Sequence, residues 1–104
     1  MSAIYSANEL GTQTLSVSTV AAGPLTPPAG TNPRHALVYV GANAIRWRAD
    51  GTAPTPTSGM YLAAGGYLSW TDPLVDYSAL IDRAQFIRDS AAAGDATIEV
   101  AFFT

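Results

Sequence analysis

The chain has 104 residues, a length that suits one domain with one modest hydrophobic core. It contains no cysteine, which excludes a disulfide framework and a thiolate metal site. Charged residues make up only 12% of the chain, about half of the usual ~25%, and the net charge is -3, which excludes the basic stripe that nucleic acid requires.

The first third of the chain predicts one strand between two irregular segments. Residues 1–13 are polar and small without periodicity, and they predict an extended N-terminal arm, with a frayed terminus as the alternative. The start MSAIYSANEL lacks the basic and apolar regions of a secretory signal. TLSVSTV (14–20) alternates between apolar and polar residues and predicts the strand that opens a single domain, residues 14–104. Residues 21–33 carry four of the seven prolines and predict an extended loop.

Strand patterns continue through the rest of the chain. HALVYV (35–40) is apolar on both faces, as expected of a central strand, and NAIRWRA (43–49) alternates cleanly. The short segment 41–43 predicts a hairpin between these two strands, and Asp50-Gly51 predicts the next turn. Further strands with the same period of two are predicted at MYL (60–62), YLSWT (67–71), QFIRD (85–89) and ATIEVAFF (96–103).

One segment is ambiguous. DYSALIDRAQFI (76–87) has a short helical pattern, but it favours a loop leading into a strand, with a helical turn at 77–83 as the alternative. Strands every 8 to 12 residues with glycine-marked turns are typical of a sandwich or barrel. The expected fold is therefore all-β, an antiparallel β-sandwich preceded by the extended arm.

The sequence offers little chemistry. The single histidine, His35, has no second histidine or cysteine with which to hold zinc, and its place at a strand start favours a structural role. The acidic residues are scattered without the spacing of a calcium loop, and Asp72 and Asp76 suit turns better than a metal site. No apolar run approaches the ~20 residues of a membrane span. We therefore expect a soluble protein, made in the cytoplasm, that is not an enzyme and uses neither cofactor nor metal.

The surface composition favours a protein partner. All five basic residues are arginines and lysine is absent, whereas 48% of the residues are hydrophobic. Protein interfaces are enriched in arginine and aromatic residues and depleted in lysine. Much of the surface is therefore expected to be covered by other protein; a surface of serine, threonine and alanine without a special partner is the alternative.

Residues 44–62 are the strongest candidate for such an interface. Arg46 and Arg48 project from one face of their strand, while Trp47 shares the other face with Ile45. In the segment 52–58, Pro54 and Pro56 stiffen the chain, which lowers the entropy lost on docking. Replacing both arginines by serine is therefore expected to weaken assembly more than the fold.

The aromatic residues leave two interpretations open. Trp47 and Trp70 each share a face with an aliphatic residue, so both are expected in the core. Tyr61, Tyr67 and Tyr77 are the expected exposed aromatics, suited either to a protein interface or to stacking on sugar rings. The predicted interface residues are Arg46, Arg48, Pro54, Pro56, Tyr61 and Tyr67.

The block ALVYVGANAIRWRADGTAPTPTSGMYLAAGGYLSW and the later AQFIRDSAAAGDATIEVAFF resemble small β proteins encoded among the structural genes of tailed bacteriophages. In that group, a strand of the form AIRWR-x-DGT-x-PT leads into an apolar segment and a glycine-marked hairpin. The resemblance covers residues 35–104 and leaves out the first third of the chain.

This resemblance implies a role in the virion and no catalytic residues. Such proteins serve as capsid decoration (cement), head-completion or tail components. Cement proteins of this size often resemble jelly rolls and often sit as trimers between capsomers. The resemblance therefore implies a jelly-roll-like sandwich, the major capsid protein as partner, a homotrimer and a place in the virion. A neck or tail component, or a carbohydrate-binding module of a receptor-binding apparatus, remains an alternative.

Overall fold

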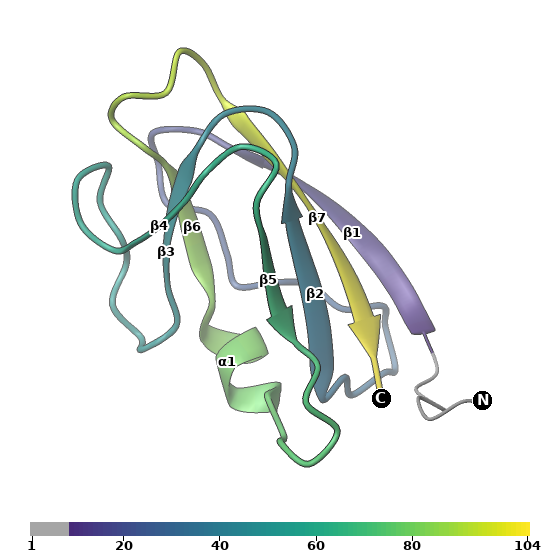
Figure 1. Cartoon of the computed structure of the whole chain (residues 1–104). Helices are drawn as coiled ribbons and strands as arrows, with labels where there is room; N and C mark the ends of the chain where they lie inside the picture. Colours follow the sequence, from purple (N-terminus) through teal and green to yellow (C-terminus); the bar gives the residue numbers. More distant parts are fainter. Residues whose placement is uncertain (1–8) are drawn as a thin grey trace.

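The computed structural model describes residues 9–104, which form seven strands and one short helix (Figure 1). The elements in chain order are β1 (Glu9–Val17), β2 (His35–Val40), β3 (Ile45–Arg48), β4 (Met60–Leu62), β5 (Tyr67–Trp70), α1 (Ser78–Arg83), β6 (Gln85–Arg88) and β7 (Ala96–Phe103). Within residues 9–104, no helix is long and apolar enough to span a membrane.

The strands form two antiparallel sheets around one core. One sheet has the order β1-β7-β2-β5 and the other has the order β4-β3-β6. Fully buried side chains come from both sheets, because alternate residues of each strand point to the same side. The core contains Val17, Ala36, Val38, Val40, Ile45, Phe86, Ile98, Val100 and Phe102, among others. The expected all-β class is confirmed at this level.

The chain passes repeatedly from one sheet to the other. Connections β2–β3, β4–β5 and β6–β7 each join strands of different sheets. The predicted hairpin at residues 41–43 is therefore wrong, since β2 has β7 on one side and β5 on the other and has no edge left for β3. Asn43, with φ of 66°, reverses the chain there, and its side-chain amide donates to the Asp95 carbonyl at 2.9 Å.

The N-terminal strand begins earlier than expected. β1 starts at Glu9 and pairs with β7 along its length, so residues 9–13 belong to the sheet and not to an arm. Its side chains alternate between the two faces of the sheet, with exposed Thr12, Thr14 and Ser16 between the inward Gln13 and Leu15. This is the period of a strand, although most of these residues are polar. The rest of the predicted arm, residues 1–8, lies outside the described residues.

The loop after β1 crosses to the second sheet before it returns to β2. Ala22 exchanges two backbone hydrogen bonds with Phe86 of β6, at 2.7 and 2.8 Å. Leu25 and Pro33 are buried, so this proline-rich segment closes one side of the core. It is a loop, as predicted, and it turns at residues 29–30, where the Thr31 N–H donates to the Pro28 carbonyl at 3.2 Å.

The loop expected before β6 is wrong, and the helical alternative is confirmed. α1 has only six residues, too few to be stable alone, but Ile81 is fully buried, and Leu80 and Tyr77 pack against the core. A carboxylate oxygen of Asp76 accepts the Ser78 N–H at 2.9 Å before the first turn. Tertiary packing therefore selects the helix.

Candidate functional site

The outer face of the four-stranded sheet is the first candidate surface. Its outward residues on β2, β5 and β7 are His35, Leu37, Tyr39, Tyr67, Ser69, Thr97, Glu99, Ala101 and Phe103. Glu99 carries the only carboxylate of this set, and no arginine lies in it. Leu37, Tyr39 and Tyr67 are among the exposed large hydrophobic residues. The face is thus broad, aromatic and nearly uncharged.

Two tyrosines form the centre of this face. Tyr39 of β2 lies directly opposite Tyr67 of β5, and their exposed fractions are 46% and 65%. The backbone groups of Tyr39 point toward β7, so the tyrosines form a non-hydrogen-bonded pair, in which side chains lie closest. Leu37 continues the apolar surface two residues along β2. Side chains of this kind commonly anchor protein interfaces.

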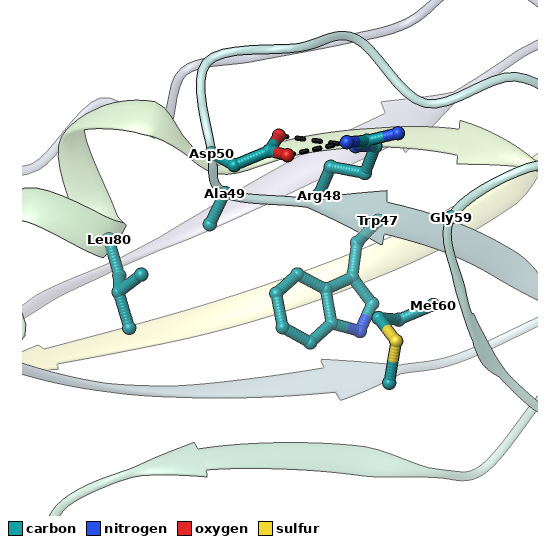
Figure 2. Close-up of a pocket in the computed structure, with 7 residues that line it drawn as sticks. All are labelled: Trp47, Arg48, Ala49, Asp50, Gly59, Met60 and Leu80. Carbon is teal, nitrogen blue, oxygen red and sulfur yellow. Dashed lines mark hydrogen bonds and ion pairs between the residues drawn. The ribbon is translucent and has the colours of Figure 1, made fainter.

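A groove of about 480 Å³ beside β3, β4 and α1 is the second candidate surface (Figure 2). We call it the Trp47 groove, after the indole that lines it. The Trp47 and Trp70 rings meet edge to face with centroids 5.7 Å apart. The groove is lined by Trp47, Arg48, Ala49, Asp50, Gly59, Met60 and Leu80.

An ion pair stands at the rim of the Trp47 groove. Arg48 Nε donates to Asp50 Oδ1 at 3.1 Å, and Figure 2 shows the guanidinium and the carboxylate beside each other. The Arg48 hydrogen bond and that of the Thr52 N–H lower the pKa of Asp50 to about 2, and the same pair raises the pKa of Arg48. The groove therefore combines apolar walls with a rim that stays charged in neutral solution.

Arg46, a predicted interface residue, is held by the protein itself. Its Nε donates to Asp89 Oδ1 at 2.8 Å and its Nη1 to the Gly59 carbonyl at 3.1 Å. The side chain of Asp89 is only 6% exposed, and its second oxygen accepts the Ala91 N–H at 2.9 Å. Arg46 thus links β3 to the turn after β6 and to the segment before β4.

The proline loop also packs against the protein. Pro54 is buried within the chain, and its contact with a partner stays a prediction. Pro56 is half-buried, and its carbonyl accepts the Ser90 N–H at 3.0 Å. Thr55 and Ser58 exchange backbone hydrogen bonds at 2.9 and 3.1 Å, which closes the loop on itself. The stiff loop therefore makes its contacts within the chain.

The six predicted interface residues do not gather into one patch. Tyr61 is 56% exposed on β4, where its ring lies 5.6 Å from the Arg46 guanidinium, whereas Tyr67 belongs to the other sheet. Trp70 is buried as predicted and Trp47 is half-buried against the core. Tyr77 is half-buried, so its predicted exposure is wrong.

Sequence reasoning missed Leu37 and Tyr39. The apolar pattern of HALVYV predicts a strand buried on both faces, and β2 is indeed central in its sheet. However, its outer face is open, so one half of the pattern marks an exposed surface. The sequence signal for this exposed surface was a short strand with apolar residues on both of its faces.

The single histidine contacts other parts of the chain. His35 Nε2 lies 3.1 Å from the Asp72 carbonyl, and its ring meets Tyr77 edge to face. Across residues 9–104, no group of three or more histidine, cysteine, aspartate or glutamate side chains is placed to hold a metal ion.

No family model, curated protein or solved structure matches this chain.

Proposed function

We propose that this chain is a structural protein of a bacteriophage virion, in the role of a capsid decoration protein that binds between major capsid subunits. The observation that carries the proposal is the outer face of the four-stranded sheet, which is aromatic, exposed and nearly free of charge. Exposed apolar faces of this kind mark interaction surfaces, and an assembly protein can bury such a face against its partner.

We further propose that the two sheets form a jelly-roll sandwich. The segment around Ala22 pairs with β6 and takes the place of a strand between β1 and β2. The sheets then have the orders β1-β7-β2-β5 and Ala22-β6-β3-β4, and each strand of one sheet is followed or preceded in the chain by a strand of the other. Jelly rolls are common in viral capsid proteins and lectins, which supports the proposal by analogy.

The energetic basis is a central tyrosine pair. Interface hot spots are enriched in tyrosine, and each is worth about 2 kcal/mol or more when it is buried in a partner. Tyr39 and Tyr67 lie side by side, so one partner surface can bury both. A protein that binds only the expanded shell shifts the shell population toward that state, and many copies multiply a modest gain.

Binding to expanded empty shells tests the proposal. The shells are those of the phage that encodes this chain, prepared without it. We expect the purified protein to cosediment with them and to raise their disruption temperature in scanning calorimetry. Combined Tyr39→Ser and Tyr67→Ser should weaken binding by at least about 30-fold, since one hot-spot tyrosine is worth about 2 kcal/mol.

Tyr61→Ser is the matched control, since it makes the same change at a similarly exposed tyrosine of the other sheet. It should bind shells normally. Equal losses in the control and the double variant would show that the outer face of the four-stranded sheet is not the interface. No detectable binding to expanded shells would overturn the decoration role. A stoichiometry of a single ring per particle would assign the protein to the neck or tail.

The Trp47 groove favours a second candidate function, carbohydrate binding. An indole wall and a charged rim suit a sugar ring with its hydroxyl groups, and lectin domains use this kind of fold. We expect this function to show as binding on a broad glycan array that is lost in Met60→Asp. Met60 lines the groove and is exposed, so its replacement spares the core. Silence across the array would exclude this candidate.

A further inference from the structure

β1 is an open edge of the four-stranded sheet. It pairs with β7 on one side, and Figure 1 shows it as the outermost strand of its sheet. Among residues 9–104, no backbone hydrogen bond joins β1 to any segment other than β7. Its nine residues make it the longest strand described. A long unpaired edge is a template for another strand.

The groups that face this edge can be assigned residue by residue. Gly41 N–H donates to the Thr97 carbonyl, so Thr97, and with it Glu99 and Ala101, direct their backbone groups toward β2. Ile98, Val100 and Phe102 therefore direct theirs toward β1, where they meet Leu15, Gln13 and Gly11. The alternate residues Thr12, Thr14 and Ser16 consequently direct N–H and C=O groups away from the sheet.

The usual protections of an edge strand are missing from this stretch. β1 contains no proline and no lysine, and its single charge, Glu9, lies at the first residue. The one irregularity of the β1–β7 register also lies at that end, between Glu9 and Gly11. Charges, prolines and bulges normally block edge pairing. From Thr12 to Val17 none of them is present.

We propose that a second copy of this chain occupies this edge, with the two β1 strands paired antiparallel about a two-fold axis at Thr14. In this register Thr14 faces Thr14 of the second copy, and Thr12 faces Ser16. All three residues direct their backbone groups outward, so every such group between 12 and 16 gains a partner.

The side chains suit this register. Hydroxyl residues face one another on the outer face, a favourable cross-strand combination. Glu9 faces no charged residue, because its position in this register lies opposite residue 19, a threonine beyond the end of β1. The stretch that pairs is thus self-complementary and free of like charges. A two-fold contact requires this self-complementarity.

The pairing would join two four-stranded sheets into one continuous sheet. The two outer faces, each with its Tyr39–Tyr67 pair, would then form one double-sized surface. This arrangement differs from the trimer that the phage resemblance implies, because an isologous edge contact closes at two copies. The inference rests on the geometry of β1 alone and is independent of the proposed function.

Thr14→Pro tests the contact at its axis. The Thr14 N–H bonds nothing within the sheet, so proline removes no internal ladder bond but removes the donor at the axis from both copies. Light scattering after size-exclusion chromatography should give twice the 10.8 kDa of one chain for the native protein. Thr14→Pro should raise the dimer dissociation constant by at least about tenfold, the effect of losing both axial hydrogen bonds. Thr14→Val, which keeps the N–H, should remain dimeric.

Charge substitutions at residues 12 and 16 test the register. This test does not require that the fold tolerate a proline at residue 14. Thr12→Lys with Ser16→Lys places like charges opposite each other and should yield monomers. Thr12→Lys with Ser16→Glu places opposite charges together and should restore the dimer, with a dissociation constant that rises with salt. Circular dichroism should show the native fold in both variants.

Three results would overturn the inference. The first is a native protein that is monomeric at every concentration measured. The second is a trimer or a larger closed ring. The third is a dimer that persists equally in Thr14→Pro and in the double lysine variant, since its contact would then lie elsewhere.

Discussion

Phe102→Ala is expected to lower the free energy of unfolding by about 3–5 kcal/mol. Phe102 is fully buried on β7, which lies between β1 and β2 and contributes Ile98 and Val100 to the same core. Truncating the ring leaves a cavity that two sheets on either side of the core cannot readily close. Since small domains are stable by only about 5–15 kcal/mol, this loss is a large part of the total.

The next residue provides the control. Phe103 lies on the outer face of the same strand and is half-buried, so Phe103→Ala should cost clearly less. Urea unfolding followed by tryptophan fluorescence measures both, with Trp47 and Trp70 as probes. Equal losses would mean that the register of β7 differs from the one described, because a shift by one residue exchanges the two faces.

Most of the strands could be predicted because their period is local. Ile98, Val100 and Phe102 alternate with polar or small residues, and such alternation needs no knowledge of the partner strand. β1 was predicted five residues too late because Thr12 and Thr14 alternate with Gln13, which gives no contrast in hydrophobicity. Its length becomes evident only through pairing with β7.

The sheet topology could not be predicted from these patterns. A short link such as residues 41–43 suits a hairpin, but it serves equally well to carry the chain from one sheet to the other. The choice depends on β5 and β7, which occupy both sides of β2 and lie far along the chain. The pairing is therefore a property of the whole fold.

The candidate site shows the same limit. Alternation correctly places Arg46 on the face opposite Ile45, and the arginine does meet an acidic residue of a neighbouring element. That residue, Asp89, lies 43 positions away, and only the β3–β6 pairing brings it near. Exposure of Tyr67 was predictable from the strand pattern, whereas its partner Tyr39 requires the β2–β5 register.

Arg46→Ser is expected to destabilise the fold, with a loss several times that of Arg48→Ser. Removing Arg46 leaves the little-exposed Asp89 carboxylate without its cation and the Gly59 carbonyl without a donor. The Arg48–Asp50 pair is local and more exposed, so its loss should change stability little. This reverses the expectation for Arg46 that the sequence suggests, and chemical denaturation of the two single variants measures the difference.

Asp89→Asn completes the comparison. If Arg46 acts through Asp89, the double variant Arg46→Ser with Asp89→Asn should lose less stability than the two single losses combined. Additive losses would show that the two residues act separately. Shell binding by Arg48→Ser, whose fold should be intact, then tests whether the exposed arginine serves assembly.

The same contacts predict how stability depends on pH. Hydrogen bonds from the Ala91 N–H and from Arg46 lower the pKa of Asp89. The hydrogen bond from the Ser78 N–H lowers the pKa of Asp76. The pKa of Asp50 is lowered to about 2. Because these folded-state pKa values lie below the unfolded value of about 3.9, the carboxylates stabilise the fold fully above that pH and progressively less as the pH falls toward 2. The denaturant concentration at the unfolding midpoint, measured from pH 6 to pH 2, should therefore decrease toward pH 2.

Asp89→Asn should make the loss of stability at low pH less steep, because the amide side chain has no carboxylate to be protonated as the pH falls. Asp82→Asn is the control: Asp82 is exposed on α1 and forms no ion pair within residues 9–104, so the decline should persist. A decline that is equally steep in the native protein and in Asp89→Asn would show that the Arg46–Asp89 link is not a source of stability. Arg46 would then be free for a partner, as its place on the strand first indicates.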